Sequence, residues 1–487
     1  MGSSYFYNDT CFVLCAHPKI IYAVYLFGIE NWMQIRYSSI VLVYCLYKKF
    51  VLPREASNME TNSSVLHTIS SGGYDTIFTR LYRADALEQQ RTRYTRLVNT
   101  FAQVFPDGQT PRLFSAPGRT EISGNHTDHQ RGCVVAASIH LDMIAAAAKN
   151  DCNCVRIHSE GFAFQQIDLS DLSIHPEEIN TTAALIRGTA AIFREKGFEI
   201  GGADICVSSD VLRGSGLSSS AAFEVLIGTI FSCLYNGGSL DPVLLAQIGQ
   251  LTENRYFGKP CGLMDQMACS VGGFVSIDFY NPDRPMVNKT NFDPDSYGYS
   301  LYIVDVKGDH SDLTDEYAAI PAEMKAVAAF FEKEVLRQVP AEQFYQYLAQ
   351  VREQTSDRAV LRAHHFFTEN LRAQQAAHAL QEGDMDGFLR LCQQSGRSSF
   401  MYLQNIYPSF SPLSQPASVA LMAAEHLLEG RGACRIHGGG FGGTIQAFVP
   451  NDMAAHFAAE MEKITGKDSC HLLTIRPCGG IEITEEA

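Results

Sequence analysis

The chain has 487 residues, more than one typical core holds, and this length predicts about two or three domains. Hydrophobic residues make up 46% of the chain and charged residues 19%, which is the composition of a folded, soluble protein. The net charge of −15 argues against nucleic acid or an anionic membrane surface as the partner, because both require a basic face. We therefore expect a small-molecule substrate.

The 14 cysteines are scattered, and no CxxC pair is followed by a second pair downstream. Cys152 and Cys154 form a lone CxC, which is more typical of two small strand residues than of a metal site. The pattern predicts no disulfide framework and a location in the reducing cytoplasm.

Residues 1–58 differ in composition from the rest of the chain. They hold seven of the 21 tyrosines, the single tryptophan Trp32, and two apolar runs at 20–29 and 39–47. Both runs are shorter than the roughly 18–20 residues of a membrane span, and neither has the cleavage pattern of a secretory signal. We predict an extension that lies outside the fold, with Met59 as the natural start, and keep a cryptic membrane anchor as the alternative.

Beyond residue 58 the chain alternates helical and strand patterns. Apolar residues three or four apart predict a helix from Tyr74 to Phe105, and alternation predicts a hairpin over 155–168 with Gly161 at its turn. The other elements expected in this half are strands at 112–116, 203–209 and 272–280, and helices at about 183–196, from the end of the 214–220 loop to Tyr235, and at about 243–256.

Two turn-rich segments, 281–285 and 293–296, predict a linker. The mixture of helices with antiparallel hairpins predicts an α+β fold in two domains, an N-terminal one over 59–292 and a C-terminal one over 293–487. The elements expected in the second domain are a strand at 299–306, long helices across 320–430 broken at 407–416, a glycine-rich turn at 438–443 between two strands, and a last helix and strand.

The segment RGSGLSSSAAF (213–223) has the composition of a phosphate-binding loop. Gly214 and Gly216 allow the backbone to approach a ligand closely, and the serines and alanines after them open an apolar helix. The N-terminus of a helix offers unpaired N–H groups and a positive dipole end to a phosphate, and a serine hydroxyl can reach Mg²⁺. A tight turn with a serine cap explains the segment equally well, and no GxxxxGK[ST] motif occurs.

The segment HGGGFGG (437–443) contains a formal GxGxxG pattern. A dinucleotide-binding fingerprint opens a helix inside an early βαβ unit, whereas the residues TIQAFV that follow here are typical of a strand. We therefore predict a glycine hairpin that packs against another ligand or loop, and no nicotinamide site.

Four motifs occur in order along the chain: GRxxxxGxHTDH (118–129), GSGLSSSAA (214–222), CGLMDQ (261–266) and GGGFGG (438–443). With them the chain resembles the GHMP family of small-molecule kinases, and galactokinases most closely, over about residues 75–485. The resemblance implies an N-terminal domain related to the ribosomal protein S5 fold and a ferredoxin-like C-terminal domain. ATP and a sugar would bind between the two.

The resemblance also implies roles for individual residues. Asp265 matches the catalytic aspartate, and Arg119 matches the arginine that pairs with it and with phosphate charge. Ser220 and Glu253 match the ligands of Mg²⁺. The positions that match contacts to ATP are Gly214, Ser215, Gly216, Leu217, Ser218, Ser219, Ser220 and Ala221. Those that match contacts to the sugar are Asn125, His126, Asp128, Gly262 and Tyr317, the last within an HSxxxxEY-like segment at 310–317.

The first motif departs from the galactokinase pattern GRxNxIGEHTDY at Glu121, Asn125 and His129. The family's glutamate accepts a bond from the sugar's 6-hydroxyl, whereas Asn125 accepts without charge and adds two donors. Glu121 would compensate if the segment were helical. The departures leave open a galactose-like sugar that is modified at position 6 or bears an amine. His126 and His129 around Asp128 would suit Zn²⁺, but no fourth ligand is suggested nearby.

The resemblance therefore implies a sugar kinase that uses ATP and Mg²⁺ to phosphorylate the anomeric (C1) hydroxyl of galactose or a close relative. We expect it to be cytoplasmic, as the cysteine pattern predicts, and monomeric. The alternative is a non-catalytic regulator that binds galactose and ATP without turnover. The complete GSGLSSSAA loop and Asp265 favour the enzyme. A kinase of a non-sugar alcohol is a weaker alternative, because the HTD segment is typical of sugar binding.

Overall fold

The computed structural model describes residues 63–212, 216–259, 261–308 and 313–485. Contacts divide the chain into two units, Met1–Glu60 and Thr61–Ala487, and the second unit holds the fold described below. The predicted extension at 1–58 lies outside the described residues. Within the described ranges, no helix combines the length and apolar character needed to cross a membrane.

The first sheet contains eight strands: β1 (Arg112–Ser123), β2 (Cys133–Lys149), β3 (Cys154–Ser159), β4 (Gln165–Asp168), β5 (Ala203–Ser209), β6 (Phe274–Asp278), β7 (Met286–Thr290) and β12 (Ile481–Ile483). Their order is β12-β1-β2-β5-β3-β4, with β6 paired to β2 and β7 to β6. Neighbours run antiparallel, apart from β3 and β5, which are parallel.

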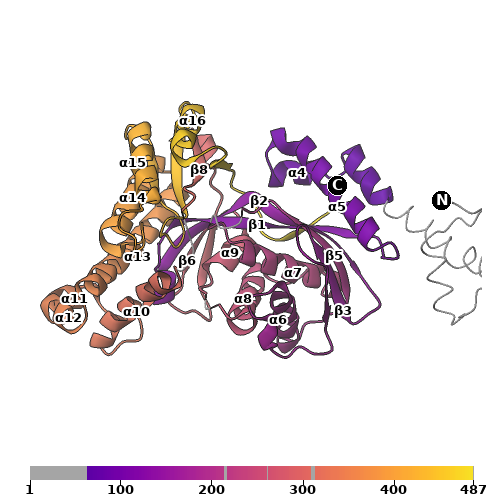
Figure 1. Cartoon of the computed structure of the whole chain (residues 1–487), viewed down its shortest axis with the longest axis horizontal. Coiled ribbons are helices and arrows are strands. Elements are labelled where there is room, and N and C mark those ends of the chain that lie inside the picture. Colours follow the sequence, from indigo (N-terminus) through magenta and orange to yellow (C-terminus); the bar gives the residue numbers. More distant parts are fainter. Residues whose placement is uncertain (1–62, 213–215, 260, 309–312, 486–487) are drawn as a thin grey trace, which may run out of the picture. The chain divides into compact units, whose positions relative to one another are not determined.

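Helices cover both faces of this sheet (Figure 1). Successive residues of a strand point to opposite faces, so Leu113 and Ile144 meet the first helical layer and Phe114 and Ala145 the second. The first layer consists of α4 (Asp75–Leu81), η3 (Ala84–Ala86) and α5 (Leu87–Val104). The second consists of α6 (Thr182–Glu195), α7 (Ser219–Tyr235), α8 (Pro242–Thr252), the π-helical turn η6 (Glu253–Phe257) and α9 (Met264–Val271).

A second, antiparallel sheet has the order β11-β8-β10-β9. Its strands are β8 (Tyr299–Asp305), β9 (Ala433–Ile436), β10 (Thr444–Pro450) and β11 (Cys470–Leu473). The helices α15 (Pro416–Leu428) and α16 (Ala454–Thr465) share a hydrophobic core with it. The other elements of this region are α10 (Thr314–Phe330), η8 (Leu336–Gln338), α11 (Ala341–Gln346), α12 (Leu348–Gln354), α13 (Asp357–Glu382), α14 (Met385–Ser398) and the π-helical turn η9 (Ser399–Leu403).

The single helix predicted from Tyr74 to Phe105 is wrong, because the chain breaks between α4 and α5. Tyr82 adopts an extended conformation there, with φ −121° and ψ 179°. Its hydroxyl donates to the buried carboxylate of Asp142 at 2.6 Å, and its side chain is itself buried. A tertiary hydrogen bond thus accompanies the interruption of a helical apolar pattern.

Three other segments differ from the sequence predictions. Residues 117–123 lie beyond the strand predicted at 112–116, yet they belong to β1 and are buried. β7 occupies 286–290, next to a predicted turn and inside the expected linker. Cys152 and Cys154 are joined by a disulfide across the turn before β3, although the cysteine pattern predicts no such bond.

The last strand of the chain joins the first sheet. In β12, Ile481 pairs with Ser115 and Ile483 with Leu113 of β1. The predicted domain boundary at residue 292 stays a prediction. β12 lies in the predicted C-terminal domain, yet it pairs with a strand of the predicted N-terminal domain. The end of the chain therefore contributes to the N-terminal core.

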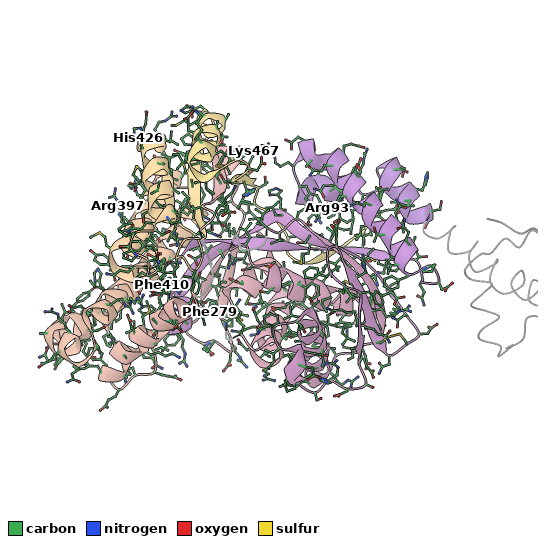
Figure 2. The ribbon with its side chains drawn as sticks, in the orientation of Figure 1. Arg93, Phe279, Arg397, Phe410, His426 and Lys467 are labelled. Atoms are coloured by element: carbon green, nitrogen blue, oxygen red, sulfur yellow. A yellow bond between two sulfur atoms is a disulfide. The ribbon has the colours of Figure 1, made fainter. Side chains whose placement is uncertain are left out.

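Asp142 is the centre of a buried polar network beneath α4 and α5. Its carboxylate is fully buried and accepts hydrogen bonds from Arg93 at 2.6 Å, Arg476 at 3.0 Å, and the hydroxyls of Tyr82 and Ser115. Arg93 comes from α5, next to the sheet (Figure 2), and Arg476 from the segment that leads into β12. The network connects the first helical layer, the sheet and the C-terminal segment.

Candidate active site

The phosphate-binding segment lies against the first motif. Ser218 has left-handed backbone angles (φ 59°), and α7 begins at the next residue. The backbone N–H of Arg119 donates to the carbonyl of Leu217 at 3.1 Å. A Cβ atom on Gly118 would lie 2.9 Å from that carbonyl oxygen, so the close approach of the two segments requires glycine.

The predicted nucleotide contacts fall into three groups. Gly214 and Ser215 lie outside the described residues. Leu217 and Ala221 have fully buried side chains, so they can offer a phosphate only their backbone groups. Gly216, Ser218, Ser219 and Ser220 lie at the start of the mostly buried helix α7, whose free N–H groups and dipole suit an anion.

Asp265 and Arg119 form a bidentate ion pair in front of this helix. Arg119 Nε and one terminal nitrogen donate to the two carboxylate oxygens of Asp265 at 2.7 and 2.8 Å. The remaining terminal nitrogen of Arg119 donates to the carbonyl of Gly216, and the hydroxyl of Ser218 donates to Asp265. Burial by itself would raise the pKa of Asp265, but the charge and hydrogen bonds of Arg119 hold it below its usual value. The carboxylate is therefore ionised at neutral pH.

The structure also brings together the two predicted ligands of Mg²⁺. The hydroxyl of Ser220 donates to Glu253 Oε1 at 3.2 Å, and the Glu253 side chain is only 3% exposed. Glu253 lies where α8 gives way to the π-helical turn η6, a distortion that is often found at functional sites. One carboxylate and one hydroxyl suit Mg²⁺, which usually takes its other ligands from phosphates and water.

Two residues around Glu253 were not singled out in the sequence. Gln266 donates to Glu253 at 2.8 Å and to Glu224 at 2.9 Å, and so connects the two carboxylates. Burial and the neighbouring Glu253 raise the pKa of Glu224 well above its usual value. Glu224 follows Ser220 by one helical turn, so its place beside the site could have been inferred from helical spacing.

Asp128 and Gly262 meet directly. A Cβ atom on Gly262 would lie 2.0 Å from Asp128 Oδ2, so any larger residue there would have to displace the Asp128 carboxylate. Asp128 Oδ1 accepts the backbone N–H of His129 at 2.8 Å. Burial raises the pKa of Asp128 to about 6. The motifs at 118–129 and 261–266 thus converge beside Asp265.

The glycine-rich turn packs against this region, as predicted, and leads into β10 and not into a helix. Three successive carbonyls of the turn are hydrogen bonded at short range. Gly438 accepts from Asn125 at 2.6 Å, the carbonyl of Gly439 is 3.0 Å from His126 Nε2, and Gly440 accepts from the hydroxyl of Tyr317 at 3.2 Å. The turn therefore supports three of the predicted sugar-binding residues.

Asn125 has no hydrogen-bonding atom left for a sugar. It is fully buried, and its amide nitrogen donates to Glu121 at 2.9 Å as well as to Gly438. Its amide oxygen accepts from Asn405 at 2.8 Å and Ser399 at 3.3 Å. The predicted contact between Asn125 and the sugar therefore has no support in this geometry, because the protein occupies all four hydrogen-bonding positions.

Glu121 does not take over that contact either. It is a residue of strand β1, not of a helix, and its carboxylate pairs with the buried Arg435 at 2.7 Å. The carboxylate that the family pattern places at position 125 is thus replaced here by one at position 121, and the two positions touch. Through its ion pair with Arg435, this carboxylate links β1 to β9.

Tyr317 and the histidines complete the predicted sugar region. The ring of Tyr317 is 36% exposed and meets Phe441 edge to face, with 5.3 Å between the ring centres. The preceding residues 309–312 lie outside the described residues. The rings of His126 and His129 are 5.6 Å apart. Across the described ranges no group of three or more His, Cys, Asp or Glu side chains could hold a metal ion, so the zinc alternative gains no support.

Comparisons with known proteins agree with these motifs. Residues 184–273 match the family described as GHMP kinases N terminal domain, and residues 99–149 match the one described as galactokinase galactose-binding signature. The chain is 34% identical over 381 residues to a galactokinase of Actinobacillus pleuropneumoniae, covering 76% of this chain and 94% of the relative. It is also 34% identical over 360 residues to a galactokinase of Glaesserella parasuis serovar 5, covering 72% and 88%.

Solved structures share the fold. The structure of Lactococcus lactis galactokinase complexed with galactose superimposes with a TM-score of 0.69 at 24% identity, covering 80% of this chain and 99% of that one. A mevalonate kinase superimposes with a TM-score of 0.52 at 13% identity, covering 74% and 98%. The predicted two-domain α+β fold of GHMP kinases is therefore confirmed. From its motifs, its fold and its relatives, this chain belongs to the galactokinase family of GHMP kinases.

Proposed function

We propose that this protein is an ATP-dependent galactokinase that transfers the γ-phosphoryl group to the anomeric (C1) hydroxyl of galactose or a close relative. One observation supports this proposal most strongly. The ionised Asp265 is held by Arg119, accepts a hydrogen bond from Ser218 at the start of α7, and is an electrostatic neighbour of Asp128, which contacts Gly262. A phosphate donor and a sugar hydroxyl would meet at this carboxylate.

Phosphoryl transfer requires positioning and charge stabilisation more than covalent chemistry. Asp265 would orient the C1 hydroxyl and accept its proton. Arg119 keeps Asp265 ionised and adds positive charge next to the transferring group. Bound to Ser220 and Glu253, Mg²⁺ would neutralise phosphate charge. The cofactors of the proposal are therefore ATP and Mg²⁺.

The sugar would be recognised mainly by Asp128 and His126, next to the bare backbone of Gly262 and the exposed ring of Tyr317. A carboxylate accepts charge-assisted hydrogen bonds from sugar hydroxyls and so discriminates their stereochemistry. Asn125 would act indirectly, by fixing the loop that carries His126 and Asp128 against the glycine-rich turn. Action in the cytoplasm as a monomer remains a prediction from the sequence.

The test is ADP release by the purified full chain with Mg–ATP and a panel of hexoses and pentoses. We expect saturable release with galactose and a sugar 1-phosphate as the product. Saturable binding of galactose without ADP release from any sugar would refute the enzyme and leave the regulatory alternative. Release with a sugar altered at position 6, but not with galactose, would correct the substrate.

The affinity for galactose is expected to fall at acid pH through Asp128. Its pKa of about 6 means that the carboxylate becomes protonated below that pH and loses its strength as an acceptor. The KM for galactose should therefore rise as the pH falls through about 6, while kcat changes less because the pKa of Asp265 is lowered. Asp128→Asn should raise KM at every pH and flatten this profile. An unchanged pH dependence in Asp128→Asn would assign the titration to another group.

Asn125→Asp is expected to destabilise the fold. The substitution replaces the two donors toward Glu121 and Gly438 by an acceptor and sets a second carboxylate beside Glu121. Each buried hydrogen bond that is lost costs about 1–3 kcal/mol, which urea unfolding measures. Asn288→Asp, at an exposed position of β7, is the matched control. If the variant had normal stability but an altered affinity for galactose, the result would support the predicted direct contact between Asn125 and the sugar.

A further inference from the structure

A lysine outside the four motifs lies at the edge of the same site. Lys259 Nζ is 3.3 Å from Glu253 Oε1, the oxygen that also accepts from Ser220. The partners differ in exposure, since the side chain of Glu253 is 3% exposed and that of Lys259 is 60% exposed. The ammonium group therefore reaches a buried carboxylate from the open side of the site.

The backbone brings Lys259 to this position through η6 and the glycine after it. Gly258 adopts the left-handed conformation (φ 85°) that ends many helices. Its N–H and that of Lys259 both donate to the carbonyl of Glu253, at 3.0 and 3.2 Å. The chain thus turns back over the start of η6, and the side chains of Glu253 and Lys259 are set next to each other.

Arg119 and Lys259 are two cations of this site with different freedom. Arg119 is 6% exposed and is fixed by Asp265 and the carbonyl of Gly216. Lys259 carries its charge at the end of a flexible, exposed side chain, which can rotate away from Glu253. Burial would lower the pKa of Lys259, but the carboxylates of Glu253 and Asp265 raise it overall, so the charge is retained.

We propose that Lys259 is a phosphate-binding residue, which neutralises Glu253 in the empty enzyme and contacts the nucleotide's phosphate oxygens when Mg²⁺ occupies Glu253. A divalent cation and an ammonium group at one carboxylate oxygen repel each other strongly. The other carboxylate near Lys259, that of Asp265, is already paired with Arg119, so the ammonium group would turn to the phosphate at Ser218 to Ser220. The inference rests on the proposed function for the place of the nucleotide and adds a residue to its binding site.

Calorimetric titration of inorganic triphosphate into the full chain, with Mg²⁺ present, tests this without sugar or turnover. Lys259→Met should weaken triphosphate binding about 10-fold or more, the value of a hydrogen bond to a charged group. Lys259→Arg should retain most of the affinity. Lys196→Met, at the exposed lysine that follows α6, is the matched control and should bind like the wild type.

A double-variant cycle separates a phosphate contact from a purely structural ion pair. In EDTA, where Lys259 of the wild type stays paired with Glu253, Glu253→Gln frees the lysine. Triphosphate should then bind more tightly than to the wild type, and adding Lys259→Met should abolish the gain. Equal triphosphate affinities of Glu253→Gln and the double variant in EDTA would overturn the inference, as would undetectable triphosphate binding to the wild type with Mg²⁺ present. The triphosphate titration contains no sugar and is independent of turnover. If the chain bound triphosphate through Lys259 but released no ADP in the kinase assay, the proposed enzyme activity would be refuted and the phosphate contact of Lys259 would stand.

Discussion

Replacing Asp265 with asparagine is expected to lower kcat for galactose phosphorylation by about 10²–10⁴-fold, the usual contribution of a positioned general base. Asparagine has the same shape, but it cannot take up the proton of the C1 hydroxyl. It also leaves Arg119 with a neutral partner in place of a bidentate carboxylate. The affinity for Mg–ADP should change much less than kcat, because the negatively charged carboxylate of Asp265 repels the phosphates and does not bind them. Steady-state ADP release and calorimetric titration of Mg–ADP measure the two quantities.

The matched control for this substitution is Asp386→Asn. Asp386 also lies in the first turn of a helix, α14, but is exposed. Its replacement should leave kcat unchanged, which shows that losing a charge at a helix N-terminus is not the cause. Asp265→Asn with the activity of the wild type would remove the proposed base, and the mechanism would then reduce to positioning by Arg119 and the phosphate loop.

Asp142→Ala is expected to lower the free energy of unfolding by about 3–5 kcal/mol, the usual cost of removing one partner of a buried ion pair. Arg93 and Arg476 would keep their charges inside the protein with no carboxylate between them. Urea unfolding, followed by circular dichroism, measures the change. Asp452→Ala, which breaks the exposed pair with Arg431, is the control and should cost at most about 1 kcal/mol.

The same network predicts how stability depends on pH. Burial by itself would raise the pKa of Asp142, but Arg93 and Arg476 hold it below its value in the unfolded chain. Between the two pKa values the unfolded chain binds more protons, so stability rises with pH there. The contribution of Asp142 is complete above the unfolded pKa of about 3.9 and is lost as the pH falls through the folded value. Asp142→Asn should reduce this acid dependence, and an unchanged slope would contradict the network's role.

Much of the candidate site could be predicted from the sequence because its chemistry resides in short segments. The glycines and serines of 214–222 indicate a phosphate-binding helix start, and the pairing of Ser220 with Glu253 follows from the family pattern. The prediction that 437–443 forms a glycine turn before a strand is confirmed by β10. In both glycine-rich segments the deciding residues lie within a few positions of one another, whereas Ser220 and Glu253 are 33 positions apart and were paired only through the family pattern.

Asn125 shows where that reasoning stops. Its motif position matches a sugar contact, yet its amide oxygen accepts from Asn405, 280 residues further along the chain. Arg435, which takes the carboxylate of Glu121, is similarly distant, at a separation of 314 residues. Neither partner lies in a pattern that points back to the first motif, so a substitution inside a motif could not be assigned its structural role from the sequence.

The fold shows the same limit. The alanine-rich end of β2 lacks the branched residues typical of strands, yet it pairs with β1 on one side and β5 on the other, and helical layers cover both of its faces. Likewise, the helical pattern of 74–105 is interrupted at Tyr82, whose hydroxyl reaches Asp142.

By itself the sequence determined the α+β class, the phosphate loop and the family, because these depend on residue types within short motifs. The Asp265–Arg119 pair follows from the family pattern, although the two residues are 146 positions apart. Only the tertiary structure decided the burial of Asn125, the exchange of its carboxylate for Glu121, and the ion pair of Lys259 with Glu253. The physical reason is that a polar group's role depends on whether protein partners already satisfy its hydrogen bonds and charge. Those partners are brought together by packing and not by order along the chain.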